Sequence, residues 1–116
     1  MKDLGELEFR VMQALWAGDV AMTVRDVYEE LQAERKLAYT TVMTVLDRLA
    51  KKSMVNRVLN GRAWYYRPSL SLASLVGRQM YATLRDAGPD SKGALKEFVF
   101  RLSPEELEML KGVVSE

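Results

Sequence analysis

The chain has 116 residues, of which 48% are hydrophobic and 28% are charged, and its formal net charge is +1. This length and composition predict one compact, helix-rich domain with at most a short appendage, and they exclude a large catalytic cavity and extended disorder. Because the chain contains neither cysteine nor histidine, disulfides, thiolate or imidazole metal sites, cysteine nucleophiles and histidine bases are excluded, and we expect no enzyme activity, no metal and no cofactor.

Two amphipathic helices are predicted at the start of the chain. Apolar residues recur at helical spacing between Leu4 and Trp16, and Gly18 with Asp19 ends this first helix. Thr23 is placed to cap a second helix, with Asp26 at the third helical position. The residues expected on the buried face of this second helix are Val24, Val27, Tyr28 and Leu31.

A third helix is predicted from about Ala38 to Lys52. Its apolar residues recur at positions i, i+3, i+4 and i+7, which defines the side that faces the core. Because successive helical residues are about 100° apart, the opposite side carries mostly short polar side chains. The inward residues are Val42, Val45, Leu46 and Leu49, the outward ones are Thr40, Thr44, Asp47 and Lys51, and Met43, Thr41 and Arg48 lie on the shoulders.

The threonines of this third helix favour a role in DNA recognition. Threonine is a poor helix former, so Thr40, Thr41 and Thr44 on an exposed side gain nothing for helix stability. Small hydroxyl side chains let a helix sit close to base edges and phosphates, and their methyl groups can contact the thymine methyl. The alternative is an ordinary core helix whose threonines are merely solvated.

A β-hairpin is predicted after the third helix. Val55–Leu59 and Arg62–Tyr66 are rich in β-branched and aromatic residues, and Asn60-Gly61 between them is a strong hairpin signal. Three helices followed by such a ribbon are the order of elements in a winged helix, in which the third helix reads the DNA and the ribbon is the wing. The first domain is therefore expected to end near Pro68.

The wing carries two kinds of candidate side chain. Arg57 and Arg62 flank its tip and can reach phosphates or the minor groove. Trp64 and Tyr66 are expected to pin the ribbon to the first and third helices. Stacking of these aromatic rings on single-stranded bases is the weaker alternative, because it requires several exposed rings along a groove.

Three short helices are predicted after Pro68. Ser69–Ser71 opens the fourth helix, Ala87–Asp90 ends it, and Ser103 with Glu106 caps the sixth. These helices are too few and too small for a convincing core of their own, so their apolar faces are expected to pack against those of a second subunit. The residues predicted at this dimer interface are Leu75, Tyr81, Leu84, Phe98, Leu102, Leu107, Leu110 and Val114.

The positive charge is concentrated in the middle of the chain. The segment from Arg35 to Arg67 contains eight basic residues and one acidic residue, Asp47, which gives +7, whereas residues 1–34 and 68–116 carry −5 and −1. The third helix and the hairpin both lie in this segment. Its charge therefore predicts a surface that contacts DNA phosphates.

Two other binding functions stay open. A winged-helix module could use the same basic surface for an acidic protein partner, and an architectural protein could bind DNA without sequence preference. Catalysis is not supported, because acidic pairs such as Glu6 with Glu8 lie near helix starts or on solvated faces. No glycine-rich phosphate loop, nucleophile elbow or metal-ligand spacing occurs.

The location of the protein is expected to be the cytoplasm. No run of about twenty apolar residues occurs, so no membrane contact is expected. The first residues of the sequence also lack the apolar core of a secretory signal.

The stretch from Leu37 to Val55, LAYTTVMTVLDRLAKKSMV, resembles the penicillinase-repressor family of winged-helix transcriptional regulators (BlaI/MecI/CopY type). The opening from Leu4 to Trp16 and the segment Thr23–Val27 are similar to this family too. The similarity spans essentially the whole chain and is strongest up to about Arg67. It implies a mainly α fold with a small antiparallel β-ribbon, with a winged helix-turn-helix domain at residues 1–68 and a three-helix dimerisation region at residues 69–116.

The resemblance also implies a function. Members are repressors that bind a palindromic double-stranded DNA operator as homodimers, often upstream of β-lactam-resistance genes, which would connect this chain with antibiotic resistance. At matching positions, bases would be read by Thr40, Thr41, Met43 and Thr44, with Arg48, Lys51, Arg57 and Arg62 near the DNA backbone or in the wing. Tyr39, at the start of the reading helix, completes the predicted DNA-binding set.

The resemblance leaves the inducing signal open. Penicillinase-type members are inactivated by proteolysis at an Asn-Phe bond in the fifth helix, and this chain has Glu97-Phe98 at that place. The departure puts induction by the same protease in question, although an inducing protease remains a candidate partner. Copper-responsive members carry a cysteine-rich tail, so a chain without cysteine is not a copper sensor of that type.

Overall fold

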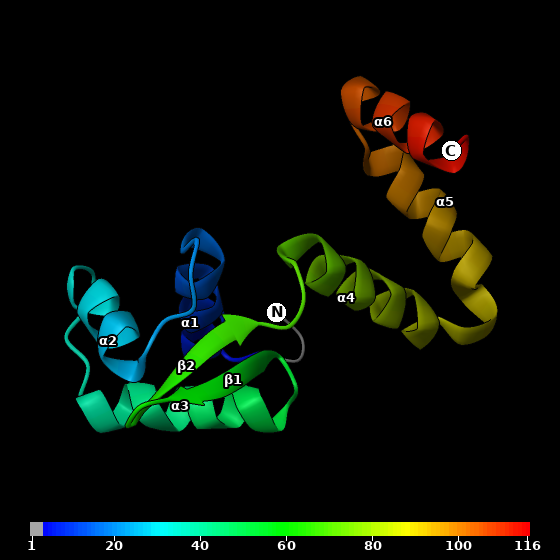
Figure 1. Cartoon of the computed structure of the whole chain (residues 1–116). Helices are drawn as coiled ribbons and strands as arrows, with labels where there is room; N and C mark the ends of the chain where they lie inside the picture. The colour runs from blue at the N-terminus through cyan, green and yellow to red at the C-terminus, as the bar shows by residue number, and fades with distance from the viewer. Residues whose placement is uncertain (1–3) are drawn as a thin grey trace. The chain divides into compact units, whose positions relative to one another are not determined.

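The computed structural model describes residues 4–116, which form two units, one extending to Gln79 and the other beginning at Met80. Within this range the first unit has three helices, a two-stranded sheet and the start of a fourth helix (Figure 1). The mainly α class with a small antiparallel ribbon is confirmed. The elements are α1 (Glu6–Ala17), α2 (Val24–Gln32), α3 (Tyr39–Lys51), β1 (Val55–Asn60), β2 (Ala63–Pro68) and α4 (Leu72–Asp86).

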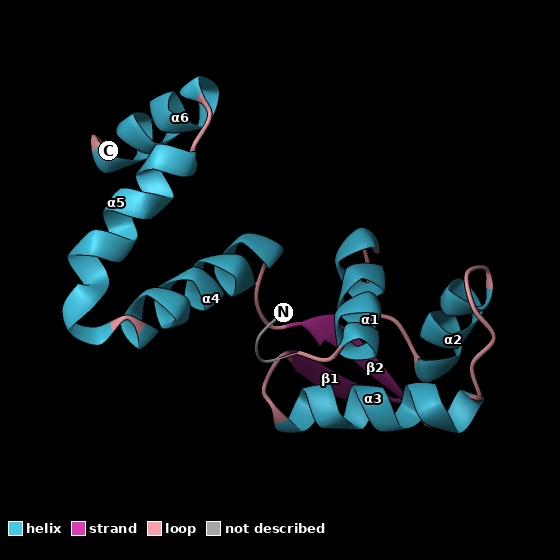
Figure 2. Cartoon of the chain, turned by 180° about the vertical axis from the view of Figure 1, so that it is seen from behind, coloured by secondary structure: helices cyan, strands magenta, loops and turns pink. Residues whose placement is uncertain are grey.

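The core of the first unit is built around the inward face of α3, which contacts α1, α2 and β1 (Figure 2). Val42, Leu46 and Leu49 are completely buried, as the helical spacing predicts. Burial of one such side chain stabilises the fold by about 1.5–3 kcal/mol relative to an exposed one. The buried residues that surround this face are Leu4, Val11, Met12, Leu15, Val27, Leu31, Val45, Met54, Val55, Tyr66 and Leu75.

The start of α2 follows the predicted capping pattern. The Thr23 hydroxyl accepts a hydrogen bond from the Asp26 backbone N–H at 3.1 Å, and the Asp26 carboxylate accepts one from the Thr23 N–H at 3.0 Å. Just before this cap, Met22 forms a β-bridge with Tyr66, in which the two residues exchange backbone hydrogen bonds of 3.0 and 2.8 Å. The link between α1 and α2 is thereby joined to the wing.

The wing turns one residue later than the sequence signal suggests. Val55 pairs with Pro68 and Asn60 with Ala63, so the two-residue loop is Gly61-Arg62 and the predicted Asn60-Gly61 loop is wrong. Gly61 has φ 65°, whereas Arg62 is not among the residues with positive φ. A type I′ turn needs positive φ at both central residues, but a glycine at the first position suits the II′ arrangement. Arg62 therefore occupies the loop itself rather than a strand.

The connection from the wing to α4 is anchored on α1. The indole N–H of Trp16 donates to the Leu70 carbonyl oxygen at 2.9 Å. Leu75, one turn into α4, is completely buried in the core of the first unit. It was predicted at a dimer interface, but its side chain is covered within the chain. The compact first unit also extends past the predicted boundary at residue 68, because the first half of α4 packs with it.

The second unit contains the rest of α4 and three further helical elements, with no buried residue in the described helices η1, α5 and α6. Ser103 and Glu106 form the predicted capping box, with hydrogen bonds of 2.9 and 3.1 Å. Large apolar side chains are exposed on this unit. The elements are η1 (Gly88–Asp90), α5 (Ser91–Arg101) and α6 (Pro104–Val114), and the exposed apolar residues are Met80, Tyr81, Leu95, Phe98, Phe100, Met109, Val113 and Val114.

One buried carboxylate ties the start of α1 to the end of α3. Glu8 accepts a hydrogen bond from the Gly5 N–H at 2.9 Å, and both its oxygens lie 2.9 Å from the Lys52 ammonium. Burial raises the pKa of the Glu8 carboxyl, but the bonds from Gly5 and Lys52 and the nearby charge of Arg48 outweigh this effect, and the pKa lies below its ordinary value of 4.5. Glu8 thus fixes one end of α3 relative to α1.

We predict that Glu8→Gln lowers the free energy of unfolding by about 1–3 kcal/mol at neutral pH, because the charge-assisted hydrogen bonds from Lys52 are lost. Glu6→Gln is the matched control, since Glu6 is an exposed carboxylate paired with Arg35, and it should change stability by less than about 0.5 kcal/mol. Urea unfolding measures both values.

The same pair of proteins tests the pH dependence. Because the pKa of Glu8 is lower in the folded chain than its ordinary 4.5, its stabilisation is complete above that pH and is lost as the pH falls through the folded pKa. The gap in stability between wild type and Glu8→Gln should therefore close on acidification. A gap that stays constant down to the acid limit of folding would contradict this role.

Candidate nucleic-acid interface

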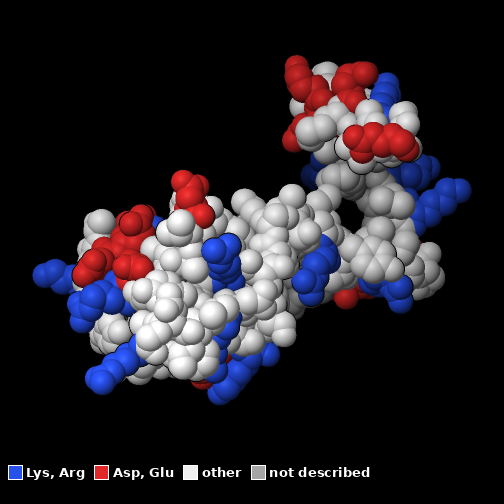
Figure 3. Space-filling view, viewed as in Figure 1, with Lys and Arg blue, Asp and Glu red and all other residues white. Residues whose placement is uncertain are grey.

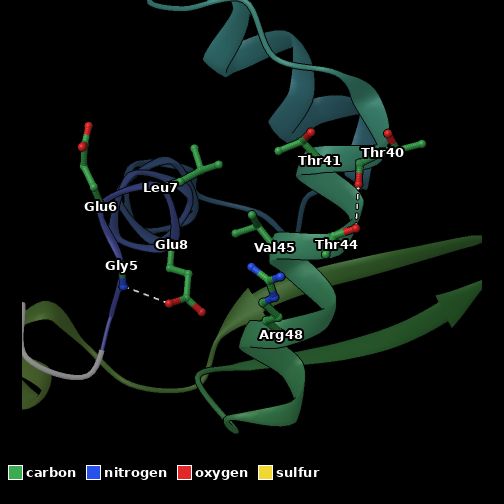
Figure 4. A pocket seen from close by; sticks show the side chains of 9 residues that line it. All are labelled: Gly5, Glu6, Leu7, Glu8, Thr40, Thr41, Thr44, Val45 and Arg48. Atoms are coloured by element: carbon green, nitrogen blue, oxygen red, sulfur yellow. Dashed lines mark hydrogen bonds between the residues drawn. The ribbon is translucent and has the colours of Figure 1, made fainter.

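The outward face of α3 presents the predicted threonines to solvent. Thr40 and Thr44 are exposed, and Thr41 is half-buried. The Thr44 hydroxyl donates to the Thr40 backbone oxygen at 2.9 Å (Figure 4). With its proton committed inside the helix, the Thr44 oxygen is left as an acceptor, and the methyl group remains an apolar contact. Thr44 is therefore suited to an amino group or a methyl group on a base edge.

A hollow of about 460 Å³ lies between this face and the start of α1. Figure 4 shows the Arg48 side chain near Val45, with Glu8 extending from α1 toward it. Arg48 is exposed and has no ion-pair partner among residues 4–116. Its guanidinium is thus available to an anion beside the threonines. The residues that line the hollow are Gly5, Glu6, Leu7, Glu8, Thr40, Thr41, Thr44, Val45 and Arg48.

The first turn of α3 is held by an aromatic contact with α2. The Tyr39 ring meets the Tyr28 ring edge to face, with centroids 5.5 Å apart, and the Arg25 guanidinium lies 5.5 Å from the Tyr39 centroid. Tyr39 and Met43 are 38% and 45% exposed, so both predicted contact residues reach the surface. Arg25 was missed from the sequence because it lies in the acidic first third of the chain.

The wing places its two arginines differently. Arg57 lies over the Trp64 ring at 4.7 Å and 3.8 Å from the Asp47 carboxylate of α3. Trp64 is 42% exposed, so the expectation that it pins the ribbon to the helices is wrong for Trp64, whereas Tyr66 is buried as expected. Arg62 occupies the exposed loop without an ion-pair partner in the described range.

Part of the segregated positive charge is neutralised by the acidic segment. Arg35 pairs with Glu6 and Lys52 with Glu8, while Lys51 lies 3.2 Å from Asp47. In Figure 3 the acidic side chains of the first unit gather over α1 and α2, and basic side chains line its lower edge, where Figure 1 places α3. Four basic residues of the segment have no ion-pair partner among residues 4–116, namely Lys36, Arg48, Arg62 and Arg67.

The predicted DNA-binding residues thus come from two adjoining elements, α3 and the wing. The remaining predicted dimer residues all lie in the helical second unit. Tyr81, Phe98 and Val114 are 59%, 41% and 76% exposed. The others, Leu84, Leu102, Leu107 and Leu110, are half-buried within the chain.

No helix within residues 4–116 combines the length and apolar character needed to cross a bilayer. In the same residues no three acidic side chains converge as metal ligands would.

Comparison with known proteins gives consistent matches. The family model for the penicillinase repressor matches residues 4–116. The transcriptional regulator BlaI of Mycobacterium tuberculosis is 43% identical over 115 residues, which cover 97% of this chain and 83% of that protein. BlaI of a second strain of this organism matches with the same identity and coverage.

Two solved structures resemble the winged-helix part. The solution structure of the DNA-binding domain of the repressor BlaI superposes with a TM-score of 0.56 at 27% identity, covering 61% of this chain and 85% of that chain. Bacillus licheniformis BlaI, solved as a monomeric form in complex with the blaP half-operator, superposes with a TM-score of 0.53 at the same identity and coverage. Both of these structures are of the repressor BlaI, and one of them contains bound operator DNA.

Proposed function

Because the chain belongs to the penicillinase repressor family and is a DNA-binding transcriptional repressor, not an enzyme, we propose that it binds a palindromic operator as a homodimer. The reading surface in this proposal is the outward face of α3, with the wing on the adjacent backbone. The observation that carries it is the exposure of Thr40 and Thr44 beside Arg48, which forms no ion pair with any of residues 4–116. Genes of the β-lactam response are the proposed targets, by similarity to BlaI.

The division of labour follows from the side chains. Thr40, Thr41, Met43 and Thr44 would contact base edges in the major groove, where each base pair presents a distinct pattern of donors, acceptors and methyl groups. Phosphates would be held by side chains that surround this face and carry no sequence information. The proposed phosphate contacts are Arg25, Tyr39, Arg48, Lys51, Arg57 and Arg62.

A second copy is the proposed partner of the exposed apolar side chains in the second unit. A symmetric pair would place two copies of α3 on one face of the duplex, with half-sites about one helical turn or a multiple apart. Burial of Phe98 and Val114 against another copy would remove large apolar areas from water.

An inducing protease stays a proposal for relief of repression. The Glu97-Phe98 bond lies inside α5, which runs from Ser91 to Arg101. A protease binds its substrate in an extended form, so cleavage there would require α5 to unwind locally. We therefore propose that any such cleavage depends on opening of α5.

We predict that Thr44→Val weakens binding selectively. Valine keeps the shape and one methyl group but removes the oxygen acceptor, so base pairs that present an amino group to Thr44 should lose about 1–2 kcal/mol, while other positions are unaffected. Competition binding with every single-base variant of a duplex selected from a random library measures the profile. Equal losses on the selected and scrambled duplexes would contradict a reading role.

We predict that Arg62→Ala weakens binding to all duplexes alike. Loss of one phosphate contact should lower the slope of log K against log salt concentration by about one unit. Lys111→Ala, which removes an exposed cation of α6 paired with Glu108, should leave the slope unchanged. Fluorescence anisotropy titrations at several salt concentrations measure the slopes. An unchanged slope for Arg62→Ala would remove the wing tip from the interface.

We predict that Phe98→Glu shifts the protein from dimer to monomer, because a charge would be buried in the apolar contact between copies. The neighbouring exposed substitution Glu97→Lys on the same helix is the control and should leave the dimer intact. Sedimentation equilibrium gives the assembly state, and circular dichroism verifies that α5 still folds. A wild-type chain that sediments as a monomer at every concentration would contradict the proposal.

A further inference from the structure

We propose that Asp47 is a specificity-determining residue that weakens binding to DNA of the wrong sequence. The inference rests on the proposed function, because it assumes that α3 and the wing meet the duplex. Asp47 is the only acidic residue between Arg35 and Arg67, and it lies on α3 one turn beyond Thr44 and two turns beyond Thr40. Its side chain is 46% exposed, so the carboxylate faces the same solvent as the threonines.

The Asp47 carboxylate interacts with cations of both DNA-contacting elements. One oxygen lies 3.2 Å from the Lys51 ammonium, one turn along α3. The other lies 3.8 Å from the Arg57 guanidinium, which belongs to β1 and is itself stacked over Trp64 at 4.7 Å. If Asp47 served only to form an ordinary solvated ion pair within α3, its contact with Lys51 would be sufficient. The contact with Arg57 extends the network from α3 to the wing and holds both cations close to a single negative charge.

This arrangement lowers the affinity for phosphate alone. Binding to DNA of arbitrary sequence comes almost entirely from phosphate contacts, and Lys51 and Arg57 supply two of them in the proposed interface. To contact a phosphate, Lys51 or Arg57 must either separate from the Asp47 carboxylate or bring that negative charge close to the duplex. An exposed ion pair is weak, so Lys51 and Arg57 remain available to DNA, but loss of each ion pair with Asp47 reduces the free energy gained on binding phosphate.

The same carboxylate discriminates among base edges. An ionised carboxylate only accepts hydrogen bonds. In the major groove it is repelled by N7 and O6 of guanine and by O4 of thymine, and it is tolerated beside the amino groups of cytosine and adenine. A duplex that places an amino group opposite Asp47 compensates for release of the cations, whereas a duplex that places an acceptor there does not. Asp47 thus separates right from wrong sequences mainly by penalising the wrong ones.

The test is the Asp47→Asn variant of the full chain. Its amide neither holds the two cations by charge nor repels acceptors. Two duplexes of equal length serve as probes, one selected from a random library by the wild-type protein and its scrambled counterpart. We expect roughly threefold to tenfold tighter binding to the scrambled duplex and a smaller change on the selected one, so that their affinity ratio falls. The salt slope on the scrambled duplex should rise by about one unit.

Two further variants make the result specific to Asp47. Asp19→Asn removes the same charge from an exposed position outside α3 and should leave the ratio unchanged. In an Arg57→Ala background, Asp47→Asn should have a smaller effect, because one of its two cations is already absent. Thermal unfolding of each variant verifies that the fold is retained.

The outcomes separate this inference from the proposed function. If the wild-type chain prefers no duplex, the proposed function fails and the inference with it. If the wild type discriminates but Asp47→Asn leaves the ratio and the salt slope unchanged, the inference alone is overturned. Weaker binding of Asp47→Asn to the selected duplex with no gain on the scrambled one also overturns it, because that result means that Asp47 attracts a particular base rather than penalising the others.

Discussion

The structure depends on one constraint, which is that α3 must be buried on one side and open on the other. Val42, Leu46 and Leu49 are completely covered by neighbouring elements, while Thr40 and Thr44 are exposed on the opposite side. Burial fixes the rotation of the helix about its axis, and rotation decides which side chains an approaching duplex meets. The Glu8–Lys52 pair then fixes one end of the helix against α1. One side of α3 therefore packs in the core, and the opposite side is available to contact DNA.

Several basic residues of the first unit form ion pairs with acidic residues, so the positive charge of the middle segment is partly neutralised. The basic middle segment meets acids of α1 through Arg35 with Glu6 and Lys52 with Glu8, which join distant parts of the chain. These pairs use cations that would otherwise add to a general attraction for polyanions. Arg48 and Arg62 stay unpaired within the described residues and lie on α3 and in the wing loop. The net charge of +1 therefore hides a division between cations that hold the fold and cations that face outward.

Much of the architecture was accessible from the sequence because its signals are local. The inward face of α3 and the capping boxes at Thr23 and Ser103 depend on residues within a turn or two of each other. The turn of the wing lies one residue later than predicted, and the burial of Val55 and Tyr66 could not have revealed this, because both registers place these two residues on the same face of the ribbon. The dimer assignment of Leu75 could not anticipate that the start of α4 packs on the first unit. The ion pair of Asp47 with Arg57 joins α3 to β1, and the residue pattern within each element gives no information about contacts between them.

The anchoring of the ribbon has a consequence for how this fold can diversify. Its base is secured, since Val55 and Tyr66 are buried and Tyr66 is bridged to Met22, whereas the loop at the far end is exposed and a Cβ placed on Gly61 would meet no atom of the described residues within 4 Å. Because side chains alternate with a period of two, adding or deleting a pair of residues in each strand would lengthen or shorten the ribbon and leave every side chain on its original face. Relatives could therefore change the reach of this arm in steps of two residues without disturbing the packed interior.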